Sequence, residues 1–204
     1  MLKGMEKALD QYLRNEVLVH APLHKNQHAY QKAKSTITAL HRLVSSIERA
    51  HEAKEIALCA FIDIEGAFDN TSYDSIEEAA IGKGFHPAVI TWIKAMLSER
   101  RVKATVAGVS ATITTAKGCP QGGVLSPLLW SVVVDDLLNT LITIGYEVRG
   151  YADDIVIIIR GQIDAIVSHS MQRASRNSGA EVRVYVSTRR RPLLCRSLRE
   201  GSYI

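Results

Sequence analysis

Two adjacent carboxylates, Asp153 and Asp154, follow Tyr151-Ala152 and precede five β-branched apolar residues, 155–159. This apolar run has high strand propensity, so we expect a hairpin that carries both acids at its turn. Neighbouring anions repel each other and lose hydration when a turn is covered. A divalent cation that bridges the two carboxylates would offset both costs.

A third carboxylate, Asp63, lies at the end of the apolar segment 55–64, which is typical of a central strand. Because burying an unpaired charge is costly, we expect Asp63 at the strand end, facing a cleft. If the two strands are neighbours, three carboxylates converge, as in sites where two divalent ions about 3.5–4 Å apart catalyse phosphoryl transfer. Hard oxygen ligands favour two Mg²⁺ ions, with Mn²⁺ as the alternative. Taken singly, each aspartate is equally an ordinary strand cap or turn residue.

A loop rich in glycine and proline lies between these acids, in the segment 117–130. Glycine lets the backbone approach a ligand closely, and the N-terminus of the helix expected next favours phosphate or template backbone. Gln121 has both a donor and an acceptor, so it can contact a sugar or a base edge. Alone, such a loop is also an ordinary connection before a helix.

The elements that must position these residues follow from hydrophobic periodicity and from caps. Helices are expected at 1–18, from a Ser35 or Thr36 cap to about 53, and at 72–83, 87–98, 127–144 and 163–178. Strands are expected at 55–64, on both sides of Ala107-Gly108 within 101–115, around the paired acids, and at 181–187. The segment 20–34 is expected to be a loop, and nothing periodic follows Thr188.

Bulk composition narrows the class of protein. The 204 residues and 22.5 kDa fit one domain, and 47% apolar residues exclude a disordered chain. The net charge of +4 suits a polyanionic partner without requiring one, and the basic clusters also suit a solvated surface. Three cysteines without zinc-type spacing argue against a disulfide framework and favour a reducing compartment. No secretory signal and no apolar stretch long enough for a bilayer is present, and nothing identifies a protein partner.

Three segments, Phe61–Asp69, Gly118–Leu129 and Tyr151–Asp154, resemble motifs A, B and C of reverse transcriptases. Their order and spacing fit that family. The sequence is most similar to non-LTR (LINE-type) retrotransposon enzymes of the insect jockey-like kind, in which segments like Leu2–Lys7 and Gln27–Thr36 precede motif A. The resemblance covers about residues 1–160.

The resemblance implies an α/β (α+β) polymerase palm with partial fingers, a small antiparallel sheet backed by helices, and no thumb. It assigns 1–54 to the fingers and 55–187 to the palm, and leaves 188–204 as an irregular basic tail. The implied function is that of an RNA-directed DNA polymerase domain fragment, truncated at both ends. Its partners would be an RNA template, a DNA primer and a dNTP. Such proteins act in the nucleus and are made in the cytosol.

The resemblance also assigns roles at the metal site. Asp63 and Asp153 would hold the catalytic metal ions, with the Ile64 carbonyl as an extra ligand. Asp154 would support the metal site and the primer end. Tyr151 would pack near the primer terminus, although ordinary strand packing is the alternative for this residue.

Further roles concern the nucleotide and the template. Phe68 matches the steric-gate position, where its ring would exclude a 2′-hydroxyl, although a core aromatic is the alternative. The backbone up to Ala67 would run beside the triphosphate. Gln121 and Gly122 would lie against the nucleotide sugar and the template. Two lysines that precede motif A would contact template or incoming phosphate; they are Lys32 and Lys34.

The match decays after Arg160, where the family expects an Asn and a Lys-Thr pair that this chain does not retain. That lysine is thought to protonate the leaving pyrophosphate. One alternative is therefore a catalytically inactive remnant that keeps the palm fold and at most weak nucleic-acid binding. Another is a viral RNA-templated RNA polymerase, against which Phe68 argues.

Overall fold

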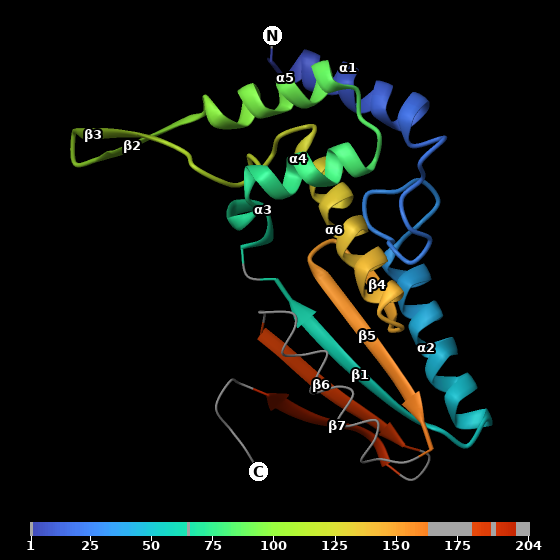
Figure 1. Cartoon of the computed structure of the whole chain (residues 1–204). Coiled ribbons are helices and arrows are strands. Elements are labelled where there is room, and N and C mark those ends of the chain that lie inside the picture. The colour runs from blue at the N-terminus through green and yellow to red at the C-terminus, as the bar shows by residue number, and fades with distance from the viewer. Residues whose placement is uncertain (1, 65, 163–180, 189–190, 199–204) are drawn as a thin grey trace. The chain divides into compact units, whose positions relative to one another are not determined.

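The computed structural model describes residues 2–64, 66–162, 181–188 and 191–198 (Figure 1). The chain forms two compact units, and each combines two separate segments. The helical unit comprises Met1–Leu23 and Gly66–Asp136, and the sheet unit comprises His24–Glu65 and Leu137–Ile204. This division differs from the predicted fingers–palm boundary at residue 54, because residues 24–54 group with the sheet. The helix expected at 163–178 lies outside the described residues.

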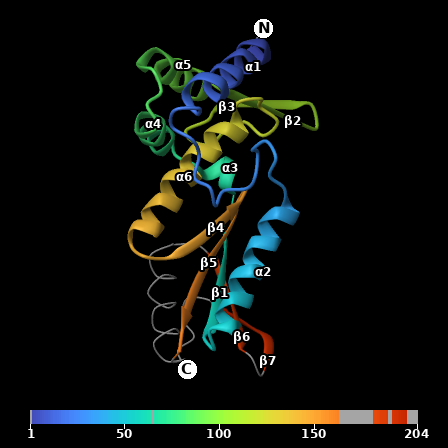
Figure 2. The same cartoon turned by 90° about the vertical axis from the view of Figure 1, so that its right-hand side faces the viewer.

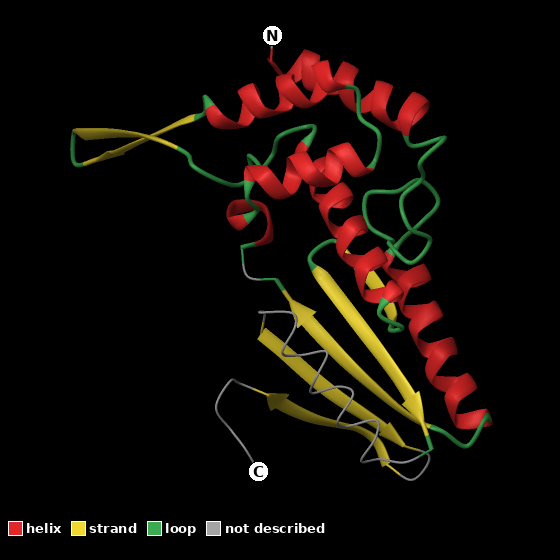
Figure 3. Cartoon of the chain, viewed as in Figure 1, coloured by secondary structure: helices red, strands yellow, loops and turns green. Residues whose placement is uncertain are grey.

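The helical unit is built from helices (Figure 3), most of which were expected; the short α3 was not, and the helix expected at 1–18 ends in a π-helical turn. Its elements are α1 (Leu2–Tyr12), the π-helical turn η1 (Leu13–Val17), α3 (Ala67–Asn70), α4 (Tyr73–Gly82), α5 (Pro87–Ser98) and the start of α6 (Ser126–Thr143). Ser72 caps α4, and His86 caps α5, where Pro87 is tolerated in the first turn. These helices bury a common apolar core around Leu13, Leu97 and Leu128.

The expected pair of strands around Ala107-Gly108 is confirmed as the hairpin of β2 (Arg101–Val106) and β3 (Val109–Thr114). Both turn residues have positive φ, 50° at Ala107 and 84° at Gly108. Two such residues make the turn whose twist matches that of the flanking strands. The hairpin is exposed along its whole length.

The sheet unit contains five strands, and each neighbouring pair is antiparallel. The strand order is β4 (Glu147–Tyr151), β5 (Asp154–Gly161), β1 (Ile56–Asp63), β6 (Glu181–Thr188) and β7 (Arg191–Leu198). The apolar β1 is central, as its composition predicts. The expectation of an irregular tail is wrong for Arg191–Leu198, because this segment pairs with β6 through backbone hydrogen bonds that need no periodic pattern of side chains.

Helix α2 (Thr36–Glu52) lies along one face of this sheet (Figure 2). Of the two predicted caps, Ser35 is the N-cap, and it forms a capping box with Thr38. The apolar side chains of α2 pack only in part: Leu43 and Ile47 contact the sheet, whereas Ile37 and Leu40 are 77% and 59% exposed. None of the helices within the described ranges combines the length and apolar character needed to span a membrane.

Candidate active site

The predicted acidic residues Asp63, Asp153 and Asp154 lie where β1 ends and β5 begins, and we call this place the acidic edge. Strands β1 and β5 are neighbours, and their register pairs Asp63 with Asp154. Asp153 immediately precedes β5, in a turn where Ala152 has a φ of 54°. Since directly paired residues of two strands point to the same face, Asp63 and Asp154 lie side by side. The predicted adjacency of the two strands is therefore confirmed, and the metal-binding role stays a prediction.

The electrostatics of this acidic edge favour a cation. The pKa of Asp154 is raised, first by partial burial and then by the negative charges of Asp153 and Asp63. Within the described residues, no group of three or more His, Cys, Asp or Glu side chains is arranged to hold a metal ion. The donor set nevertheless fits a hard divalent cation, because its ligands are carboxylates whose repulsion a cation would relieve.

A segment of the 20–34 loop adds to the sheet beside these acids. The His28 N–H donates to the Gly150 carbonyl at 2.9 Å, and the Gly150 N–H donates to the Asn26 carbonyl at 2.9 Å. Tyr30 has a φ of 55°, and its pKa is raised by burial and by the neighbouring Asp153 and Tyr151. Tyr30 thus belongs to the surroundings of the acidic edge, a role that its position in an expected loop did not reveal.

The two predicted template lysines differ in their surroundings. Lys34 Nζ donates to the carbonyls of Lys25 and Gln27, at 3.2 and 2.7 Å. Its ammonium group therefore stabilises the loop itself. Lys32 is exposed and is the better placed of the two for a contact with nucleic acid.

A cluster of buried polar side chains joins α2, β4 and the 20–34 loop. Arg149 Nη2 donates to Ser46 Oγ at 2.6 Å and to Glu147 Oε1 at 2.8 Å. His28 is 1% exposed, and its Nδ1 lies 3.2 Å from Thr38 Oγ1. Burial, and then the positive charges of Lys34, Arg42 and Arg149, lower the pKa of His28 to about 4. Sequence patterns did not indicate this cluster, because its members lie on separate elements.

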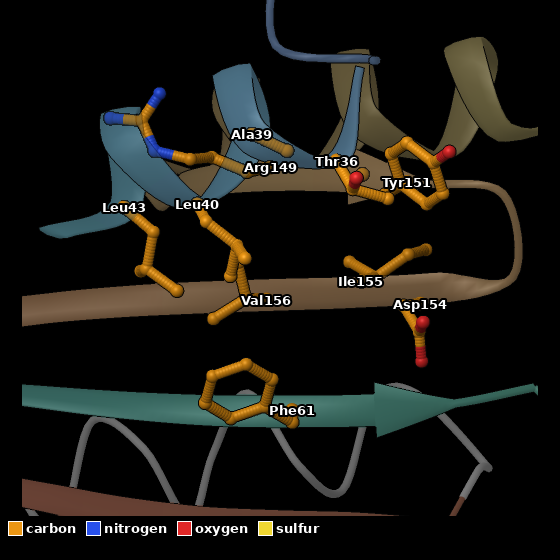
Figure 4. A pocket seen from close by; sticks show the side chains of 11 residues that line it. Thr36, Ala39, Leu40, Leu43, Phe61, Arg149, Tyr151, Asp154, Ile155 and Val156 are labelled. Carbon is orange, nitrogen blue, oxygen red and sulfur yellow. The ribbon is translucent and has the colours of Figure 1, made fainter. Parts of the chain in front are cut away.

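An apolar pocket of about 260 Å³ lies between α2 and the sheet (Figure 4). Leu40, Leu43 and Phe61 line it, with Tyr151 and Asp154 at one end. Most of its lining residues are apolar, and Thr36 and Arg149 add polar groups. The half-buried Tyr151 packs as a wall of this pocket, beside its predicted role at the primer terminus.

In the helical unit, the residues after Asp63 meet the motif B loop, which we define as Gly118–Gly123. The Gly118 N–H donates to the Thr71 carbonyl at 2.8 Å, and the Cys119 N–H donates to the Phe68 carbonyl at 2.6 Å. Gly118 has a φ of 86°, and a Cβ there would lie 2.5 Å from the Asp69 carbonyl oxygen. Only glycine fits both conditions.

The predicted nucleotide residues of this unit are close together. Gln121 is exposed, and its Nε2 donates to Asp69 Oδ2 at 2.8 Å, a partner that the motif pattern did not indicate. Phe68 is half-buried, with its ring centroid 5.9 Å from that of Trp130. Ala67 is buried, whereas Gly122 is exposed. Phe68 therefore has a packing role, and its gate role stays a prediction.

The N-terminus of α6 is occupied by a side chain that the sequence did not single out. The backbone N–H groups of Val124 and Leu125 both donate to Glu6 Oε2, at 2.7 and 3.1 Å. Glu6, on α1, is 4% exposed. Both amides precede the first residue of α6, Ser126, so a carboxylate occupies the entry to the helix. The binding of phosphate or template backbone by the N–H groups of α6 itself stays a prediction.

Comparisons with known proteins define the class. Residues 1–185 match the family model for reverse transcriptase (RNA-dependent DNA polymerase). The chain is 31% identical over 172 residues to the RNA-directed DNA polymerase from mobile element jockey of Drosophila melanogaster, covering 79% of this chain and 19% of that protein. It is 28% identical over 167 residues to the Pol polyprotein of type-1 retrotransposable element R2 of Popillia japonica, covering 76% of this chain and 24% of that protein.

Solved structures agree on the fold. Apo telomerase from Candida tropicalis superimposes with a TM-score of 0.65 at 10% identity, covering 98% of this chain and 37% of that chain. A form of the same enzyme truncated from its C-terminal domain gives a TM-score of 0.60 at 12% identity, over 99% of this chain and 41% of that one. The fold is a polymerase palm, and the chain belongs to the reverse transcriptase family, with non-LTR retrotransposon proteins as relatives. It spans about a fifth of the length of the curated relatives it matches.

Proposed function

We propose that this chain is the RNA-directed DNA polymerase domain of a non-LTR retrotransposon protein, working in the nucleus. It would transfer a deoxynucleotide from a dNTP to the 3′-hydroxyl of a DNA primer paired with an RNA template. The observation that carries the proposal is the pairing of Asp63 with Asp154, next to Asp153, in a chain of this family.

The acidic edge would hold two Mg²⁺ or Mn²⁺ ions through Asp63, Asp153 and the Ile64 carbonyl. Bound divalent ions favour attack by the primer hydroxyl and neutralise charge on the departing pyrophosphate. Asp154 would support this site and the primer end, and Tyr151 would pack against the primer terminus.

Residues of the helical unit would select the nucleotide. Gln121, oriented by Asp69, would contact the sugar or the template with its amide, and Gly122 would let the template approach the backbone. The ring of Phe68 would exclude a 2′-hydroxyl. Template RNA would be bound through backbone and 2′-hydroxyl contacts, with Lys32 as a phosphate ligand.

The direct test is primer extension by this chain on poly(rA)/oligo(dT) with Mg²⁺. We expect extension by the wild type and none by Asp153→Asn. In a parallel measurement, Mn²⁺ should raise the melting temperature of the wild type but not that of Asp63→Asn, because a ligand that binds only the folded state stabilises it. Persistent extension by Asp153→Asn would contradict the metal-site assignment.

A second test concerns the nucleotide sugar. Phe68→Val should increase incorporation of ribonucleotides relative to deoxynucleotides, measured with rUTP and dTTP on the same primer. Because Phe68 also packs against Trp130, the melting temperature of the variant is measured alongside. Unchanged sugar selectivity in a folded variant would remove the gate role from Phe68.

The second candidate is a remnant that keeps the fold without catalysis. The observation that favours it is the lack, after Arg160, of the Asn and the Lys-Thr pair that the family expects. A folded wild-type chain that extends no primer and gains no stability from Mn²⁺ would establish this alternative.

A further inference from the structure

We propose that Glu6 is a positioning residue for the motif B loop, and that it sets the conformation in which Gln121 and Gly122 contact the nucleotide. The contacts of Glu6 belong to the helical unit. Their effect on nucleotide binding rests on the proposed polymerase function.

The Glu6 carboxylate is buried and specifically bonded. One of its oxygens, Oε2, accepts hydrogen bonds from the consecutive N–H groups of Val124 and Leu125, at 2.7 and 3.1 Å. Bonds to an ionised acceptor are stronger than neutral ones, and the N-terminus of the 18-residue α6 adds a favourable dipole. These interactions offset the cost of burying the charge.

The motif B loop is held at both ends. Its beginning is bonded to the end of motif A and the residues just after it, through Cys119 to Phe68 and Gly118 to Thr71. Its end leads directly into Val124 and Leu125, which are bonded to Glu6. Between these anchors Gln121 and Gly122 are exposed. The position of the exposed pair therefore depends on both anchors, of which only the first lies within the polymerase motifs.

Loss of the second anchor has a specific consequence. Leu125 is fully buried, so water cannot readily replace the carboxylate at its N–H group. The loop end would then sample other conformations, and the fraction of molecules competent to bind nucleotide would fall. The apparent affinity for nucleotide falls by the same fraction. A Glu6 that served only to pack α1 would affect global stability without this selective effect.

The experiment compares Glu6→Ala and Glu6→Gln with Glu16→Ala, a matched control at an exposed glutamate of η1. Amide hydrogen exchange is measured at Gly122–Leu125 and in α5, and KM for dTTP and kcat are measured on poly(rA)/oligo(dT). In Glu6→Ala, exchange at Val124 and Leu125 should accelerate about tenfold and KM should rise about tenfold. Exchange in α5 and kcat should stay within about twofold of the wild type.

The glutamine variant keeps the size of the side chain and one carbonyl acceptor, so its KM should rise by only about threefold. It also carries the test if Glu6→Ala does not fold. The proposal is overturned by exchange that is unchanged at the loop, by equal acceleration in the loop and in α5, or by an unchanged KM. If the wild type extends no primer, the polymerase proposal fails, and the exchange pattern alone still decides whether Glu6 positions the loop.

Discussion

The two units treat their carboxylates in opposite ways. In the helical unit, Glu6 and Asp135 are buried and compensated. Two backbone amides bond to Glu6, and Lys83 Nζ lies 2.6 Å from Asp135 Oδ2. In the sheet unit, Asp63 and Asp154 are largely exposed and lie side by side. The pKa of Asp154 is raised by partial desolvation and by the negative charges of Asp153 and Asp63.

This difference distinguishes carboxylates that stabilise the fold from carboxylates that are available to bind a ligand. A buried carboxylate with its partners in place stabilises one conformation, since removing a partner leaves an uncompensated charge. Carboxylates that crowd at an exposed edge destabilise the fold until a cation binds. The helical unit thus holds the motif B loop in position, and the sheet unit carries the residues that would bind metal.

The largest change in stability is expected when the buried carboxylate of Asp135 loses its ion-pair partner in the helical unit. Lys83→Met should lower the free energy of unfolding by about 4 kcal/mol, because Asp135 then remains buried without its cation. Urea denaturation measures this change. Lys94→Met is the matched control, since Lys94 forms an equally short ion pair with Glu77 at the surface. A similar loss in both variants would show that burial does not distinguish the two pairs.

A smaller loss of folding stability is expected when a methyl group is added in the motif B loop. Gly118→Ala should cost about 3 kcal/mol, because its φ is positive and the new Cβ would meet the Asp69 backbone. Gly122→Ala also has a positive φ but meets no atom within 4 Å, so it should cost only about 1 kcal/mol. Equal losses in the same urea titration would show that the close approach at Gly118 does not matter.

Acid should destabilise the sheet unit through His28. The folded-state pKa of about 4 lies below the ordinary 6.5, so the unfolded chain takes up the proton first as the pH falls. The contribution of His28 to stability is constant above about pH 6.5 and is lost as the pH falls from there to about 4. Between pH 7 and pH 5 the loss is about 2 kcal/mol. Unfolding of the wild type and of His28→Gln is compared at both pH values. The same pH dependence in both proteins would assign the effect to other groups.

The smallest effect has the opposite sign. Without divalent ions at neutral pH, Asp154→Asn should stabilise the chain by about 0.5 kcal/mol, because it removes one of the crowded charges. The gain should shrink with added salt and as the pH falls toward the pKa of the carboxylate. Thermal unfolding at low ionic strength measures it. A destabilised Asp154→Asn would mean that the acidic edge is not under electrostatic strain.

Much of this structure could be predicted from local pattern. The apolar β1, the Ser35 cap and the Ala107-Gly108 turn each follow from residues adjacent in the chain, and the structure confirms them. The Glu6 contact could not be predicted, because its partner at Val124 is 118 residues away. The pairing of β7 with β6 was likewise missed, since the apolar and basic residues of β7 follow no alternating pattern.

The order of residue types alone determined that aspartates stand at the ends of strands and that a glycine loop precedes an apolar helix, because propensities and turns depend on near neighbours. Only the tertiary structure decided that Asp63 pairs with Asp154, because a shift of one residue in register would turn either side chain to the other face. It also decided which carboxylates are compensated, because charges find their partners across elements that the chain brings together only on folding.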